Sequence, residues 1–182
     1  MDKPLKETPS QTAGPYVHIG LLPQRCGVTT PLQFGNPSLQ NGEAIEIKGV
    51  VWDGDGEPVK DVLIEVWQAD CDGQFPQGGH ANWQRVAGDF DTGEWVIESI
   101  KPGRVGNAAP HLTLWIVARG INIGLHSRVY FSDEANKDDP VLKGLSQSDR
   151  ATLIADRDTN DAAAYSFNIH LQGDSETVFF DV

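Results

Sequence analysis

Short segments in which apolar and polar side chains alternate are the clearest feature of the chain. From Ile45 to Trp52, isoleucine, glycine and valine interleave with charged residues, and the turn-forming run 53–56 (DGDG) follows directly. A period of two is typical of a strand with one buried face, and Asp-Gly pairs favour tight turns. The same reasoning predicts strands over 62–69, 94–100, 111–118, 125–131 and 164–171, and a weaker pattern over 177–181 suggests a last strand.

Helix signals are sparse by comparison. Residues 148–156 are good helix formers, and Ser146 or Ser148 could cap their N-terminus. Many short strands bounded by turns, with almost no helix, predict an all-β fold. We therefore expect a β-sandwich with one or two short helices.

Residues 1–43 show no period and are interrupted by prolines and glycines throughout. They nevertheless carry a cluster of apolar side chains around Tyr16, which a disordered tail would not need. We expect residues 1–43 to form a long irregular N-terminal arm, ordered against the chain's own body or against a partner. Residues 44–182 are then the β-sandwich domain, and the two form one structural unit.

Composition narrows the function classes. The chain has 39% hydrophobic residues, 22% charged residues and a formal net charge of −12. This acidity disfavours binding to phosphate backbones. No apolar run is long enough to span a membrane, and the N-terminus lacks the apolar stretch of a signal peptide. Cys26 and Cys71 form no metal-binding motif. We expect a cytoplasmic protein with free thiols.

The residues alone do not specify a reaction. None of the five histidines has HExxH or HxH spacing, and the chain has no GxSxG or phosphate-cradling motif. Three features still invite a functional reading. Gly14-Pro15 is a stiff turn that fixes the direction of Tyr16, Arg119 ends a strand where its fork could meet an anion, and His111 begins the same strand. The alternatives are a tyrosine that packs the arm down, a solvated or ion-paired arginine and a structural histidine.

Five stretches of the chain resemble the intradiol ring-cleavage dioxygenases. They are ETPSQTAGPYVHIG (7–20), DVLIEVWQAD (61–70), SIKPG (99–103), APHLTLWIVARGINIGLHSRVYF (109–131) and QGDSETVFFDV (172–182). Catalytic chains of that family bind non-haem Fe(III) through two tyrosines and two histidines. His111 falls on one histidine position, but Thr113 replaces the other. Arg104-Val105 follows the KPG turn where the resemblance implies one tyrosine. The other is expected in the loop between Phe75 and Asp89, which is shortened here and contains no tyrosine.

The resemblance therefore points to the metal-free alpha chain of a two-chain family member, with His111 as a vestigial ligand position. It implies that a homologous beta chain binds the Fe(III), that the assembly is a higher alpha–beta oligomer, and that the pair uses O2 to cleave 3,4-dihydroxybenzoate to 3-carboxy-cis,cis-muconate. This chain would supply no catalytic residue. Its substrate-binding positions would be Tyr16 and Arg119, with Thr12, Gly14 and Pro15 in the arm. Two alternatives stay open: a β-sandwich interaction or carrier module without enzymatic context, and a homomeric enzyme with iron at His111.

Overall fold

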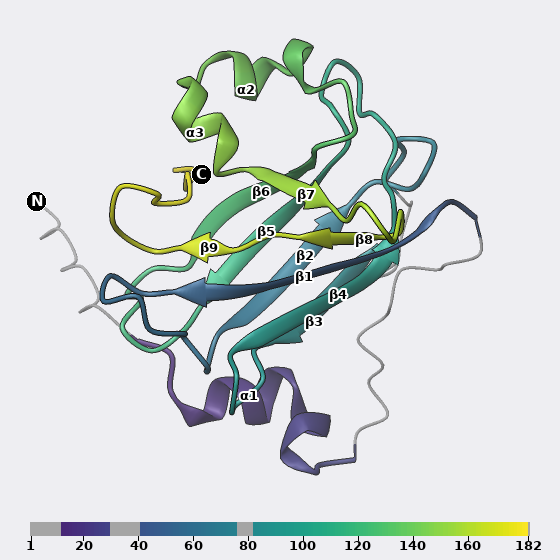
Figure 1. The fold of residues 1–182 in the computed structure, drawn as a ribbon. Helices are drawn as coiled ribbons and strands as arrows, with labels where there is room; N and C mark the ends of the chain where they lie inside the picture. Colours follow the sequence, from purple (N-terminus) through teal and green to yellow (C-terminus); the bar gives the residue numbers. More distant parts are fainter. Residues whose placement is uncertain (1–11, 30–40, 76–81, 182) are drawn as a thin grey trace, which may run out of the picture.

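The computed structural model describes residues 12–29, 41–75 and 82–181. These residues form nine strands and a few short helices (Figure 1). The strands are β1 (Ala44–Trp52), β2 (Leu63–Gln68), β3 (Trp83–Ala87), β4 (Glu94–Ile100), β5 (His111–Val117), β6 (Leu125–Phe131), β7 (Ile154–Arg157), β8 (Ala164–Ser166) and β9 (Ile169–His170). The α-helices are α1 (Pro15–Leu21), α2 (Pro140–Lys143) and α3 (Gln147–Ala151), and the 3-10 helices are η1 (Pro23–Cys26) and η2 (Asn136–Asp138).

The strands build two layers around one apolar core. Pairing runs in the order β3-β2-β5-β6-β7-β8-β1-β4, and β9 pairs with β1. The largest core cluster joins Ile47 and Trp95, from β1 and β4, to Ile64, Leu114 and other residues of strands that do not pair with β1 or β4. Since these side chains meet without strand pairing, the two ends of the sheet lie face to face. The predicted all-β sandwich is confirmed.

The alternating segments became strands because one set of positions is buried. In β5, residues 112, 114 and 116 are fully buried, while the positions between them are partly exposed on the outer face. β4 and β6 have the predicted bounds. β3 and β7 were not predicted, and β3 falls inside the interval expected to be a shortened loop; residues 76–81 of that interval lie outside the described residues.

The helix prediction over 148–156 was wrong in its second half. The Ser146 hydroxyl does cap α3, accepting a hydrogen bond from the Asp149 amide at 3.1 Å. The helix ends at Ala151, and Ile154–Arg157 is strand β7, which pairs in parallel with the end of β6. Tertiary pairing overrode local helix propensity here.

Two strand predictions also changed. The segment 164–171 is divided into β8 and β9, and between them Asn168 accepts the Val50 amide through its side-chain oxygen at 3.0 Å. Within 177–181 no strand forms; Phe180 makes one isolated bridge to His126. Helix α2 was not predicted, and α3 is shorter than expected. Both lie at the opposite end of the sandwich from α1 (Figure 1). Among the described residues, no helix is long and apolar enough to cross a membrane.

Candidate functional site

The described part of the N-terminal arm packs on the outer face of its own sandwich. Val17, Leu21 and Leu22 cluster with Leu63 of β2 and with the outward side of β5. The Arg25 guanidinium donates to the Ala87 carbonyl at 3.3 Å and to the next carbonyl, of residue 88, at 3.2 Å. Residues 12–29 are thus held by the body of the chain, and the arm is not wholly irregular, because α1 and η1 lie within it.

The turn before α1 leaves Tyr16 pointing outward. Gly14 is the N-cap in an extended conformation, and Pro15 occupies the first turn, where its missing amide hydrogen costs nothing. Tyr16 follows with 84% of its surface exposed, and its hydroxyl has no hydrogen-bond partner among the described residues. The alternative that Tyr16 packs the arm down therefore does not hold within this chain; Val17, Leu21 and Leu22 do that.

The arm meets the loop after β5 through one hydrogen bond. The Gly120 amide donates to the Thr12 hydroxyl at 2.9 Å, although the two residues are 108 positions apart. Gly120 has a φ of +87°, a conformation that favours glycine. This contact brings Thr12, the first described residue of the arm, beside Arg119.

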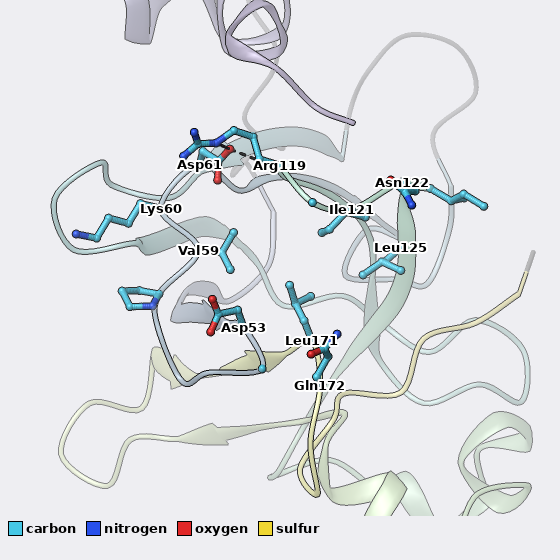
Figure 2. Close-up of a pocket in the computed structure, with 14 residues that line it drawn as sticks. Asp53, Val59, Lys60, Asp61, Arg119, Ile121, Asn122, Leu125, Leu171 and Gln172 are labelled. Atoms are coloured by element: carbon cyan, nitrogen blue, oxygen red, sulfur yellow. Dashed lines mark hydrogen bonds and ion pairs between the residues drawn. The ribbon is translucent and has the colours of Figure 1, made fainter. Parts of the chain in front are cut away.

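Arg119 is fixed by Asp61, the residue just before the strand segment that includes β2. One carboxylate oxygen, Oδ2, accepts the Arg119 Nε at 2.8 Å and the Arg119 backbone amide at 3.2 Å. Figure 2 shows the two side chains joined by dashed lines. Both line a cavity of about 900 Å³, together with Lys60 and Ile121. The Arg119 side chain remains 74% exposed. Among the described residues, none bonds its terminal nitrogens, so these are free to receive an anion.

His111 lies at the other end of β5 and in a different environment. Its Nδ1 is 2.8 Å from the Ala109 carbonyl, and its ring lies 5.4 Å from that of Tyr130. Burial lowers the pKa of His111, which favours a neutral ring at pH 7. The structure therefore does not bring His111 together with Thr12 and Arg119.

The surroundings of His111 are organised by Asp139, which is fully buried. Its Oδ2 accepts the Ala109 amide at 2.9 Å, and its Oδ1 accepts the amides of Val141 and Leu142 at 2.8 and 3.0 Å. Tyr130 donates its hydroxyl to the same carboxylate at 3.3 Å. Asp139 thus both caps α2 and holds the backbone that leads into β5.

Two positions along β5 from His111, Thr113 lies on the same outer face, in a cleft of about 500 Å³. Trp67 and Trp115 line this cleft, and Arg85 and Glu65 form an ion pair at 2.5 Å on its wall. The cleft contains apolar rings and an internally neutralised pair of charges. Thr113 thus lies in this cleft, whereas His111 is not among the residues that line it.

These residues do not fit ferric iron. Fe(III) prefers hard anionic ligands such as phenolates, and the tyrosine nearest to His111 is Tyr130. Burial raises the pKa of Tyr130, and its hydroxyl is engaged by Asp139, so a phenolate is disfavoured there. Nowhere in the described ranges do three or more His, Cys, Asp or Glu side chains gather in a way that could hold a metal ion.

Sequence comparisons place the chain among known proteins. Residues 25–173 match the family profile described as Dioxygenase. The chain is 46% identical to the protocatechuate 3,4-dioxygenase alpha chain of Pseudomonas putida, with 97% of each chain covered, and 40% identical to that of Burkholderia cepacia, with 98% of each covered. The chain belongs to the intradiol dioxygenase family.

Within the intradiol dioxygenases, the chain is also related to a second type of subunit. It is 28% identical to the protocatechuate 3,4-dioxygenase beta chain of Burkholderia cepacia, over 75% of this chain and 67% of that one. Among solved structures, it is similar to the dioxygenase domain of a carbohydrate-binding fusion protein from Streptomyces sp. SirexAA-E. That match has a TM-score of 0.61 and 19% identity, and covers 95% of this chain and 100% of that one.

A further solved relative is catechol 1,2-dioxygenase from Pseudomonas arvilla C-1, with a TM-score of 0.56 and 19% identity over 90% of this chain and 72% of that one. At such identities the likeness shows the fold alone. It confirms that the two layers described above are the intradiol dioxygenase sandwich. The family membership argues against a carrier module unrelated to these enzymes.

Sequence reasoning missed the two acidic residues that organise these sites. Asp61 and Asp139 act on groups that are 58 and 30 positions away in the chain. A lone aspartate beside a strand or before a proline carries no signal of such a long-range partner. Only the strand register could have suggested the first pair, since β2 and β5 are antiparallel with Leu63 opposite Val117.

Proposed function

We propose that this chain is the metal-free subunit of a heteromeric, Fe(III)-dependent protocatechuate 3,4-dioxygenase. An iron-bearing beta chain would cleave protocatechuate, which is 3,4-dihydroxybenzoate, to 3-carboxy-cis,cis-muconate. This chain would add part of the substrate-pocket wall and contacts for assembly. The observation that carries the role in the pocket wall is the hydrogen bond between Thr12 and Gly120, because it joins the arm that bears Tyr16 to the loop that bears Arg119.

The chemistry of the exposed groups supports a role in carboxylate recognition. A carboxylate that leaves water needs hydrogen-bond donors, preferably charged ones. Arg119 has unengaged terminal nitrogens and Tyr16 has an unengaged hydroxyl, as judged over the described residues, and both side chains are mostly exposed. An arginine fork can bind a carboxylate through two parallel bonds.

In the proposed complex, this chain acts by positioning. Arg119 would hold the ring carboxylate of the substrate, and the Tyr16 hydroxyl would donate a hydrogen bond to the same group. Ferric iron in the beta chain would supply Lewis-acid activation of the catechol oxygens and a template for O2. The contribution of Arg119 and Tyr16 is the orientation of the bound ring before reaction.

The beta-chain relative of 28% identity supports a pair of homologous subunits. We extend the proposal to a higher alpha–beta oligomer, with residues 1–43 serving as the arm and 44–182 as the sandwich domain of one unit. A cytoplasmic location is also part of the proposal. It is supported by Cys26 and Cys71, which are both free thiols.

Replacement of Tyr16 by phenylalanine in the reconstituted pair tests the proposal. Loss of a hydrogen bond to a charged group should raise KM for 3,4-dihydroxybenzoate roughly tenfold and leave kcat within about twofold. Catechol, which lacks the carboxylate, is the matched control substrate, and its KM should not change. An unchanged KM for the dihydroxybenzoate, or an equal change for both substrates, would remove Tyr16 from the pocket wall.

A further inference from the structure

We infer that Asp61 is a positioning residue for substrate specificity, which sets the direction in which Arg119 presents its guanidinium. The inference rests on the proposed function, since it assumes that Arg119 faces the carboxylate of the substrate. It adds a residue that lies outside the set expected from the sequence. Asp61 would act only through Arg119 and would not touch the substrate.

The strand register explains why the two residues meet. β2 and β5 pair antiparallel, with Leu63 opposite Val117. If the same register is continued by two residues beyond this end of the two strands, Asp61 lies opposite Arg119. The pair is therefore built into the sheet pairing and does not depend on a flexible surface encounter.

The geometry restricts Arg119 at two points. Asp61 Oδ2 binds the backbone amide of Arg119 at 3.2 Å and its Nε at 2.8 Å. With both ends of the side-chain stem tied to one oxygen, few rotamers remain. Because Nε is occupied, the edge left for an incoming carboxylate is the terminal pair of nitrogens. Figure 2 shows these nitrogens beyond the Asp61 carboxylate, at the rim of the cavity.

The loop is held from its other side by the arm. Thr12 accepts the Gly120 amide at 2.9 Å, so consecutive backbone amides, those of Arg119 and Gly120, are bound by Asp61 and Thr12 respectively. An arginine side chain loses considerable rotamer entropy when it is immobilised on binding. A side chain that Asp61 has already ordered loses less rotamer entropy when substrate binds. The resulting gain in affinity applies only to substrates that contact the guanidinium.

A purely structural role for the ion pair would be weak. The Asp61 side chain is largely covered, at 22% exposed, but the Arg119 side chain is 74% exposed. Solvent therefore screens the pair, and its contribution to folding stability is small. Variants at position 61 should therefore fold and assemble. This makes the kinetic effect separable from a loss of structure.

The experiment uses the complex of this chain with its iron-bearing beta chain. KM and kcat are measured for 3,4-dihydroxybenzoate and for catechol with Asp61→Ala, Asp61→Asn, Arg119→Ala and the double variant Asp61→Ala/Arg119→Ala. Asp61→Ala should raise KM for the dihydroxybenzoate roughly three- to tenfold, with kcat and the catechol KM unchanged. Asp61→Asn keeps an oxygen acceptor and should stay within about twofold of the wild type. Glu98→Ala removes an exposed carboxylate on β4 and controls for the change in net charge.

The double variant decides between positioning and an independent effect. If Asp61 acts through Arg119, then Asp61→Ala adds nothing once Arg119 is alanine. Additive losses, or an equal rise in KM for catechol, would overturn the inference. If Arg119→Ala raises KM but Asp61→Ala does not, the positioning role fails and the proposed function stands. If Arg119→Ala itself leaves the KM for 3,4-dihydroxybenzoate unchanged, the assignment of Arg119 to the pocket wall fails.

Discussion

Removal of the Asp139 carboxylate should destabilise the chain by several kilocalories per mole. Asp139 is fully buried and binds three backbone amides, two in the first turn of α2 and one at Ala109. In Asp139→Ala, loss of the helix cap costs about 1 kcal/mol. The buried Ala109 amide is left without a partner, at a cost of about 1–3 kcal/mol. Together these give about 3 kcal/mol, which corresponds to a fall in Tm of roughly 6–12 °C for a chain of this size.

The assay is thermal unfolding followed by circular dichroism, at one protein concentration for all variants. Ser146→Ala is the matched control, because Ser146 caps α3 through a single exposed bond to the Asp149 amide. That variant should lose only about 1 kcal/mol. Asp139→Asn should fall between the two, since one amide oxygen cannot serve both the helix amides and Ala109. Equal losses for Asp139→Ala and Ser146→Ala would refute the reasoning.

The pH dependence of folding stability provides a second test of the role of Asp139. Burial on its own would raise the pKa of this carboxyl, but hydrogen bonds from the amides of Leu142, Ala109 and Val141 outweigh burial and hold it below the ordinary 3.8. A lowered pKa in the folded state stabilises the fold above pH 3.8, and that contribution is lost as the pH falls through the folded pKa. The difference in stability between the wild type and Asp139→Ala should therefore shrink below that pH.

Three further substitutions test other parts of the account. Thr12→Val removes the acceptor for the loop amide and should raise KM for 3,4-dihydroxybenzoate in the assembled enzyme about two- to fivefold, whereas Thr12→Ser should restore it; equal values for the two variants would contradict the arm contact. Gly49→Ala would place a Cβ 1.7 Å from the Phe167 carbonyl oxygen, so urea unfolding should show a loss of about 3 kcal/mol or more, and a wild-type midpoint would refute this close packing. Thr113→His restores the second imidazole but no phenolate, so metal analysis should find no bound iron; stoichiometric ferric iron would show that the missing tyrosines are not decisive.

The sequence was most informative where one face of a strand is buried. β4 matches its predicted bounds because burial on one side imposes a period of two on the chain. β6 also matches its predicted bounds, although its last three residues are all buried. β3 was missed because its burial does not alternate. Helix α1 was missed because Gly14 and Pro15 suggest a turn, although a proline is well tolerated in the first turn of a helix.

The candidate site could be predicted only in part. Family resemblance drew attention to Tyr16 and Arg119, and the structure shows that Thr12 links their two segments. Asp61 could not be identified, because its role depends on a register between strands that local sequence does not specify. The same holds for Asp139, because its partner Ala109 lies before β5 and is separated from it in the sequence by both β5 and β6.

Iron content measured chain by chain tests the central claim most directly. The chain is purified alone and together with its beta chain, and bound iron and oxygen uptake with 3,4-dihydroxybenzoate are determined for both preparations. We predict no stoichiometric iron and no oxygen uptake for the chain alone, and one ferric ion per pair with activity for the complex. Stoichiometric ferric iron and ring cleavage by the isolated chain would contradict the account.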